Sequence, residues 1–360
     1  MKIFVSIASY RDPLLLYTVT EAYNNARYKE NLVFGIVDQS YPQEALRVGT
    51  LPFRNQIRYI NVAPEQSRGC CWARNVAQSL WAGEEYFFQI DSHIGFDPDW
   101  DVYFLDHMES LLKWHNKPVI SSYPDAMEAE NHDINTPIIK SPHRGHDTIT
   151  SLVVAADGKF GGDTGHFLGI NAINYSTKDN VVHGYLIAAG ATFTVGSVCT
   201  DVPYDPQIFF AGEEQLYALR MWTHGYSIFH TKEMPLYHYY GNEYRTTFWD
   251  KKSDKLRGVP TQWFEDRSKK RMNAVFSGHD YGPYGLGTER TIYDYSVWTG
   301  IDYRGVRCEP HAYTGLPVFS MRVDEQPPTS GAKAVVNKQA DRGSTLSGST
   351  QGLVLSGGMQ

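Results

Sequence analysis

Phe87-Phe88-Gln89-Ile90-Asp91-Ser92-His93 is the stretch of sequence that decides the fold. Its first four residues are mostly apolar and predict a buried strand, which spans 85–90 and runs directly into Asp91. Side chains alternate along a strand with a period of two, so Asp91 and His93 point the same way and can reach one cation. Such an open, mixed oxygen and nitrogen site suits Mn²⁺ better than a closed structural zinc. The alternative is a surface turn in which Asp91 caps local backbone and His93 is incidental, and spacing alone favours neither interpretation.

Three more strands of the same buried type precede this stretch, at residues 2–8, 32–37 and 56–62. Helical spacing of apolar residues predicts helices at about 13–28 and 67–82. Strands and helices that alternate in this way predict an α/β fold, in which a mostly parallel central sheet is flanked by helices.

Polar side chains gather where three of these strands end. They are Ser9 to Asp12, Asp38 to Ser40 and Asp91 to His93. In a parallel sheet the carboxyl ends of the strands meet at one edge, and ligands bind beyond that edge. The sequence therefore predicts a binding site there.

Composition excludes several classes of protein. The 360 residues include 33 Lys and Arg against 40 Asp and Glu, a formal charge of −7. General electrostatic binding to nucleic acid is disfavoured by this charge, although a local basic patch stays open. We find no run of 18 apolar residues that predicts a membrane span, and the short apolar start breaks into charge too early for a signal sequence. The four cysteines form no CxxC or zinc-type spacing, so we expect a reducing, cytoplasmic setting.

Sequence motifs of three common enzyme classes are also missing. No GxGxxG follows the first strand, and neither GxxxxGK[ST] nor GxSxG occurs. Dinucleotide-dependent dehydrogenases, P-loop NTPases and α/β-hydrolases are therefore disfavoured.

Two adjacent carboxylates, Glu213 and Glu214, open a helix predicted from Glu213 to about His224. Their charge suits the positive end of the helix dipole, which is the simplest explanation. The functional alternative is that one of them faces a substrate hydroxyl or a departing sugar. Adjacent helical positions diverge by about 100°, so the two side chains do different work.

His238 lies in a Tyr-rich run that predicts another strand end, 145 residues after His93. A single histidine in such a strand is more often structural than a ligand. Aromatic, glycine and charged residues mix over 241–303 and predict an ordered but irregular lobe. Residues 327–360 are dominated by small and polar types and predict a flexible low-complexity tail.

Arg68 and Arg74 flank the start of the helix predicted at 67–82. Helix N-termini favour anions, and guanidinium groups bind phosphate in a bidentate way, so this segment can bind phosphate. A solvated helix surface is the alternative. The adjacent residues Cys70 and Cys71 are expected to pack rather than to form a disulfide, because a disulfide between neighbours is strained.

The order and spacing of these motifs carry a resemblance that spans about residues 1–305. The motifs are Ile7-Ala-Ser-Tyr-Arg-Asp12, Arg68-Gly-Cys-Cys-Trp-Ala-Arg74, Trp81 to His93 with Trp100-Asp101, Phe210-Ala-Gly-Glu-Glu214 with Leu219 to Tyr226, and Tyr284 to Thr291 with Gly300-Ile-Asp302. Together they resemble the polypeptide GlcNAc-transferase family (glycosyltransferase family 60). The resemblance implies a GT-A glycosyltransferase fold with an irregular C-terminal lobe.

The resemblance also implies a role for each motif. Asp91 and His93 correspond to a metal motif of the DxH type, which polypeptide GalNAc-transferases also use, and His238 corresponds to the third ligand, with His311 as the fallback. Glu213 and Glu214 fall where those enzymes carry Gly-Glu-Asn, which contacts the donor sugar. The residues that the resemblance places near the nucleotide are Ser9, Arg11, Asp38, Arg68 and Arg74.

The implied reaction is a metal-dependent, retaining transfer of a sugar, best GlcNAc, from a UDP-sugar. Mn²⁺ or Mg²⁺ and arginine side chains stabilise the charge that accumulates on the departing diphosphate. The sequence offers no obvious dedicated nucleophile, which suits a front-face mechanism. The expected acceptor is a hydroxyl on a polypeptide, with a modified nucleobase, a glycan or a small molecule as alternatives.

Two other functions stay open at this point. A metal-dependent hydrolase would use Asp91, His93 and His238 to activate water and would need no nucleotide. A carbohydrate-binding or structural protein can retain a transferase fold without activity.

The sequence predicts one catalytic domain over residues 1–326. Its nucleotide-binding half is expected at 1–115, and its acceptor half and C-terminal lobe at 116–326. The tail at 327–360 is expected to be dispensable for the fold.

Overall fold

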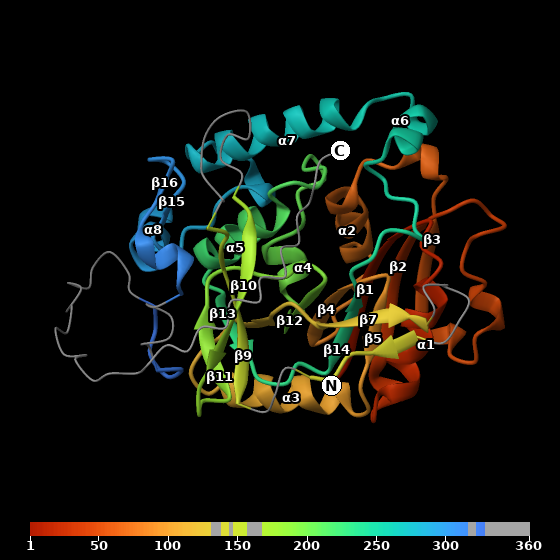
Figure 1. Cartoon of the computed structure of the whole chain (residues 1–360), viewed down its shortest axis with the longest axis horizontal. Helices are drawn as coiled ribbons and strands as arrows, with labels where there is room; N and C mark the ends of the chain where they lie inside the picture. The colour runs from red at the N-terminus through yellow and green to blue at the C-terminus, as the bar shows by residue number, and fades with distance from the viewer. Residues whose placement is uncertain (131–137, 144–146, 157–167, 316–321, 328–360) are drawn as a thin grey trace.

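The computed structural model describes residues 1–130, 138–143, 147–156, 168–315 and 322–327, and an eight-stranded sheet forms its centre (Figure 1). Its strands in chain order are β1 (Ile3–Tyr10), β2 (Leu32–Gln39), β3 (Ile57–Asn61), β4 (Tyr86–Asp91), β6 (Pro118–Ser121), β11 (Val181–Gly184), β12 (Ala191–Val195) and β13 (Ser227–Thr231). In space they follow the order β11-β13-β6-β12-β4-β1-β2-β3.

The sheet has a parallel half and a mixed half. β4, β1, β2 and β3 pair in parallel, and so do β6 and β13. β12 runs antiparallel to β4 and β6, and β11 runs antiparallel to β13. Four of the seven pairings are therefore parallel, and the predicted α/β fold with a mostly parallel sheet is confirmed.

Helices cover both faces of the sheet (Figure 1). They are α1 (Leu15–Asn25), α2 (Cys70–Gln78), α3 (Trp100–Leu111), α4 (Val198–Asp201), α5 (Glu213–Thr223), α6 (Lys251–Arg257), α7 (Thr261–Phe276) and α8 (Ile292–Thr299). Alternate residues of the central strands point to opposite faces. Val5 and Phe88 pack in one core with α1 and α3, while Phe4 and Phe87 pack in the other with α2, α4, α5 and α8.

A second, smaller sheet lies beside the end of β4. It consists of β5 (Ile94–Phe96), β7 (Asp125–Ala129), β8 (Ile138–Lys140) and β14 (Leu236–Tyr239), in the order β5-β14-β7-β8. β14 is antiparallel to β5, and His238 pairs with Ile94. This register brings His238 next to His93, which immediately precedes β5. Two further ladders pair β9 (Thr148–Val154) with β10 (Ile170–Ser176) and β15 (Ile301–Asp302) with β16 (Arg307–Cys308).

The C-terminal lobe is more regular than its sequence predicts. Residues 241–303 contain α6, α7 and α8, and α7 alone spans 16 residues. α8 begins with a capping box between Thr291 and Asp294, and it ends at Gly300. The sequence conceals these helices because glycines lie at their ends and because exposed aromatics, Trp263 and Tyr293, are mixed with buried ones such as Tyr295.

Element boundaries differ from the predicted ones at both sides of the site. β1 and β2 each continue two residues farther than expected, because their parallel ladder pairs Ser9 with Asp38 and Tyr10 with Gln39. α2 starts at Cys70 rather than at Ser67. Gly69 precedes it with a φ of 97°, and a Cβ there would lie 2.4 Å from the carbonyl oxygen of Phe209.

Two further predictions concern membrane spans and the C-terminal tail. Among the described residues, no helix is long and apolar enough to cross a membrane. The predicted tail lies outside the described residues except for its first residue, Pro327.

Candidate active site

Asp91, His93 and His238 meet beyond the carboxyl end of β4, and their ligand-type atoms all lie within 4.8 Å of one another. The Nε2 atoms of the two histidines are 3.1 Å apart. Oδ2 of Asp91 lies 3.3 Å from Nε2 of His238 and 4.0 Å from Nε2 of His93. The structure thus brings together the three side chains that the sequence and the resemblance single out as metal ligands.

The protonation of this cluster suits a site for a cation. Burial, together with the neighbouring His93, lowers the pKa of His238 to about 4, so its imidazole is neutral at physiological pH. Burial raises the pKa of Asp91, but the hydrogen bond from His238 and the charge of Arg74 outweigh it and hold that pKa below its ordinary value. An ionised carboxylate and a neutral imidazole are the forms that bind metal ions.

The ring of His93 is held from behind by Asp12. Oδ2 of Asp12 lies 2.7 Å from Nδ1 of His93 and accepts a 2.9 Å hydrogen bond from the hydroxyl of Ser92. Arg245 also contacts the ring, with its Nη1 atom 2.9 Å from Nε2 and 2.8 Å from Nδ1 of His93, and this atom lies 3.5 Å from Oδ2 of Asp12. Burial raises the pKa of Asp12, but the charges of His93 and Arg245 outweigh it and hold the pKa below its usual value.

The residues of the cluster fit a divalent cation. One carboxylate oxygen and two imidazole nitrogens match the donors that Mn²⁺ accepts. The Asp91 side chain is 25% exposed, so further ligands can reach the site from solvent. Two imidazole Nε2 atoms at 3.1 Å cannot both present lone pairs to each other, and a cation between them would remove that conflict. Nδ1 of His238 is buried without a hydrogen-bond partner among the described residues, so nothing there fixes its tautomer.

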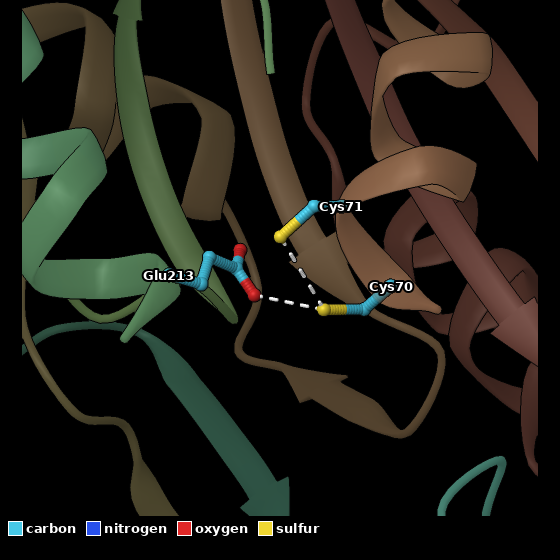
Figure 2. A group of neighbouring side chains, drawn as sticks. All are labelled: Cys70, Cys71 and Glu213. Carbon is cyan, nitrogen blue, oxygen red and sulfur yellow. Dashed lines mark hydrogen bonds between the residues drawn. The ribbon is translucent and has the colours of Figure 1, made fainter. Parts of the chain in front are cut away.

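Arg74 connects this cluster to the start of α5. Its guanidinium donates a 2.7 Å hydrogen bond to Oδ1 of Asp91 and pairs with Glu213. Figure 2 shows that Glu213 also accepts a hydrogen bond from the thiol of Cys70, at 2.9 Å, beside Cys71. All of these side chains except Asp91 are buried. Arg74 therefore neutralises two carboxylates from distant parts of the chain.

Glu214 points to a different environment from Glu213. Its carboxylate accepts a 2.8 Å hydrogen bond from the backbone N–H of Ala189 and a 3.4 Å hydrogen bond from the hydroxyl of Tyr123. No arginine pairs with it among the described residues. Burial raises the pKa of Glu214 to about 7. Glu214 is therefore able to exchange a proton near neutral pH.

The loop that precedes β12 closes tightly on Asp91. A Cβ atom at Gly190 would lie 2.5 Å from Oδ2 of Asp91. Any side chain larger than hydrogen at this position would push the carboxylate away from His238.

The predicted nucleotide-binding residues differ in how available they are to a ligand. Ser9 is buried at the end of β1, and its hydroxyl has no partner among the described residues. Asp38 is buried and already occupied, because it accepts from Ser40, from the N–H of Leu46 and from Tyr59. Arg11 pairs with Glu44 at 2.7 Å, and Arg68 is exposed on the loop before α2.

His311 does not join the cluster. It lies in a short 3₁₀ turn (Pro310–Tyr313) and packs against Gly300 at the end of α8. The fallback assignment of the third ligand to His311 is therefore wrong, because the register of β14 places His238 there instead.

Three residues of the site were not identified from the sequence. Asp12 belongs to the polar cluster expected at the end of the first strand, but the sequence assigns it no role of its own, and it assigns none to Arg245 or Tyr123. The sequence gives little indication of these residues, because each contacts a partner at least 81 residues away in the chain. The run from Tyr237 to Arg245 was noted for its histidine alone.

Comparisons with known proteins agree with this architecture. A family model described as Glycosyltransferase (GlcNAc) matches residues 40–304. The crystal structure of GalNAc-T7 with UDP, GalNAc and Mn²⁺ superposes with a TM-score of 0.53 at 12% identity, over 77% of this chain and 58% of that one. The chain thus spans less than two thirds of GalNAc-T7, and the likeness shows a shared GT-A fold.

Weaker similarities complete the comparison. The S. aureus TarS 1–349 structure gives a TM-score of 0.42 at 13% identity, over 85% of this chain and 81% of that one. Its complex with UDP-GlcNAc gives 0.40 at the same identity, over the same shares of the two chains. No curated protein matches this chain.

Proposed function

Because the chain belongs to the Glycosyltransferase (GlcNAc) family, we propose that it transfers a sugar from a UDP-sugar to an acceptor hydroxyl with the help of a divalent cation. GlcNAc is the favoured sugar, in line with the description of the family and the resemblance to polypeptide GlcNAc-transferases. The favoured acceptor is a hydroxyl on a polypeptide. GalNAc-T7, which shares the fold, was crystallised with UDP, GalNAc and Mn²⁺, which supports the choice of donor class and metal.

The observation that carries the proposal is the convergence of Asp91, His93 and His238 at the carboxyl end of the central strands. These residues would hold Mn²⁺ or Mg²⁺, which, when bound, neutralises charge on the departing diphosphate. The site is open on one side, as a cation that also binds a diphosphate requires. Ligands bind at this edge in open α/β sheets.

Arginine side chains assist the departure of UDP. Arg245 already contacts Nε2 of His93, the atom that would face the cation, so it has to turn away when the site is loaded. A diphosphate in the site gives its guanidinium a new bidentate partner. Arg11 and Arg68 lie at the surface of the nucleotide-binding half and can contact the nucleotide.

The two carboxylates of α5 divide the remaining work. Glu213 fixes Arg74 and through it Asp91, and so preserves the shape of the cluster. Glu214, half-buried beside Tyr123 and able to carry a proton at neutral pH, is placed to hydrogen-bond a hydroxyl of the sugar or acceptor.

The chemical step is a retaining transfer. The bond between the anomeric carbon and the β-phosphate oxygen breaks, and the acceptor oxygen bonds to the same face of that carbon. The acceptor proton passes to the departing phosphate oxygen, so that no protein nucleophile is consumed. Glu213 and Asp91 are both paired with Arg74, which disfavours either of them as a nucleophile.

The test measures UDP release from UDP-GlcNAc, UDP-GalNAc, UDP-glucose and UDP-galactose, with Mn²⁺, with Mg²⁺ and with excess EDTA. We expect turnover of at least one UDP-sugar that EDTA abolishes and Mn²⁺ restores. The Asp91→Ala variant, which lacks one ligand, serves as the control for contaminating activity. Turnover that persists in EDTA, or metal-dependent hydrolysis of substrates without a nucleotide, would contradict the proposal.

The domain division is part of the same proposal. Residues 1–115 would bind the nucleotide and residues 116–326 the acceptor, with the ligands Asp91 and His93 contributed by the first half and His238 by the second. Cation binding would then require both halves.

A further inference from the structure

The turn that follows β1 has a strained backbone. Arg11 adopts a φ of 47°, which is uncommon for a residue with a side chain and is unfavourable by about 1–3 kcal/mol. The next residue, Asp12, has a side chain that is 4% exposed. A strained turn that ends in a buried carboxylate suggests that the position of this carboxylate matters.

The two oxygens of Asp12 have separate partners. Oδ1 accepts a 2.9 Å hydrogen bond from the backbone N–H of Leu14, just before α1. Oδ2 faces Nδ1 of His93 at 2.7 Å, the hydroxyl of Ser92 at 2.9 Å and the guanidinium of Arg245 at 3.5 Å. One oxygen therefore serves the fold, and the other serves the active site.

The contact with Oδ2 fixes the tautomer of His93. An ionised carboxylate has no proton to donate, so the imidazole nitrogen that faces it at 2.7 Å carries the hydrogen. The lone pair of the ring is then on Nε2. The other tautomer would set the Nδ1 lone pair against the carboxylate. Nη1 of Arg245 lies 2.8 Å from Nδ1 and 2.9 Å from Nε2, so the contact with Asp12 is the one that distinguishes the two tautomers.

We propose that Asp12 is a positioning residue, which holds His93 with Nδ1 protonated so that the Nε2 lone pair faces the cation. The proposal rests on the function proposed above and extends it beyond the three ligands. Hydrogen bonds from ligating histidines to carboxylates orient the ring and raise its basicity, and their loss costs about 10- to 100-fold in metal affinity.

A purely structural role, the start of α1, makes a different prediction. Asparagine at position 12 keeps an oxygen for the N–H of Leu14, but it presents an NH₂ group to His93. His93 then has to accept at Nδ1 and carry its hydrogen on Nε2, the wrong tautomer for a ligand. Alanine loses the Leu14 contact but leaves His93 free to adopt either tautomer.

The experiment compares Asp12→Asn with Asp12→Ala by Mn²⁺ calorimetry and thermal unfolding. We expect Asp12→Asn to weaken Mn²⁺ binding by about 10- to 100-fold with little change in Tm, and Asp12→Ala to weaken it less while it lowers Tm more. The matched control is Asp101→Asn. Asp101 is another buried carboxylate that accepts backbone N–H groups, from Arg27 and Tyr28, and it should not affect Mn²⁺ binding.

A second measurement does not depend on the metal. Two-bond ¹H–¹⁵N correlation spectra of the metal-free protein report the tautomer of His93, assigned through the His93→Gln variant. We expect hydrogen on Nδ1 in the wild type and on Nε2 in Asp12→Asn. Hydrogen on Nε2 in the wild type, or an Asp12→Ala variant that binds Mn²⁺ more weakly than Asp12→Asn, overturns the positioning role. A wild type that binds no Mn²⁺ but shows the expected tautomers would overturn the metal site and leave the contact between Asp12 and His93 supported.

Discussion

Among the residues that the structure describes, two groups of three potential metal ligands occur, and they differ in the type of their side chains, in burial and in protonation. Asp91, His93 and His238 meet at an open strand edge, whereas Cys70, Cys71 and Glu213 are buried between α2 and α5 (Figure 2). Burial raises the pKa of Cys70 to about 11 and holds the pKa of Cys71 well above its ordinary value. Both thiols therefore stay protonated. The carboxylate of Glu213 is already paired with Arg74.

The difference shows that ligand type alone does not make a metal site. A metal site needs deprotonated ligands, and it must be reachable from solvent. The histidine cluster meets these conditions, since Asp91 is ionised and partly exposed. The cysteine cluster meets none of them. Arg74 joins the two clusters, because it pairs with Asp91 and with Glu213. Its guanidinium is the counter-charge for the buried carboxylate of Glu213.

The largest expected effect comes from removal of the charged ligand. Asp91→Ala should abolish Mn²⁺ binding and lower the turnover of UDP-sugars by at least about 10³-fold, because the cation loses its only carboxylate in the cluster. Calorimetry with Mn²⁺ and a UDP-release assay measure the two effects. An Asp91→Ala variant that turns over UDP-sugars at the wild-type rate would contradict the assignment of the histidine cluster as the metal site.

The next effect concerns the residue that the clusters share. Arg74→Met should lower the free energy of unfolding by about 3–5 kcal/mol, because it leaves Glu213 buried without a counter-charge. Replacing both partners, in Arg74→Met with Glu213→Leu, should restore most of the stability but not the activity. The control Arg27→Met breaks an exposed pair with Asp99, which solvent screens, and should have a much smaller effect. Chemical unfolding measures the free energy of unfolding of each variant. Equal losses in Arg74→Met and Arg27→Met would contradict this account.

A third variant tests the ligand that comes from the second half of the chain. His238→Ala should weaken Mn²⁺ binding by about 10- to 100-fold without unfolding the protein, since a strand-end histidine contributes little to the core. Circular dichroism and Mn²⁺ calorimetry are the measurements. His311→Ala is the control and should leave Mn²⁺ affinity unchanged. If His238→Ala aggregates while it still binds Mn²⁺ normally, His238 is structural.

The pH dependence of stability tests the contrast between Glu214 and its neighbour. Because burial raises the pKa of Glu214 to about 7 from its ordinary 4.5, the folded state holds a proton that the unfolded state releases between these values. The free energy of unfolding should therefore fall as the pH rises from about 4.5 to 7, because the folded state binds this proton more tightly than the unfolded state. Glu214→Gln should flatten that part of the curve in urea unfolding. An unchanged slope would show that Glu214 ionises normally.

The smallest effect is expected in the cysteine cluster. Cys71→Ala should leave the affinities for Mn²⁺ and Zn²⁺ and the metal dependence of turnover unchanged, because its buried, protonated thiol offers no ligand. Slow labelling of Cys70 and Cys71 by a thiol reagent in the folded protein would agree. Tight Zn²⁺ binding in the wild type that Cys71→Ala removes would show that the cysteine cluster is a metal site after all.

Local sequence patterns determined several features of this protein. The apolar run before Asp91 specified a buried strand, which ends at Asp91. The expected strand period of two does not place His93, because Ser92 and His93 form a turn before β5. The alternation of strands and helices specified the α/β fold. These features follow from sequence because each depends on residues within one element or between consecutive elements. The helices of the C-terminal lobe escaped prediction, since their apolar faces are mixed with glycine and charge.

Only the tertiary structure decided which distant residues complete the site. The register of β14 against β5 selects His238 instead of His311, although 145 residues separate it from His93. The strained turn at Arg11 places Asp12 behind His93, and the packing of α2 against α5 places Arg74 between Asp91 and Glu213. It also gives the adjacent residues Glu213 and Glu214 different partners. Such pairings depend on strand register and helix packing across the whole chain, and no local periodicity encodes them.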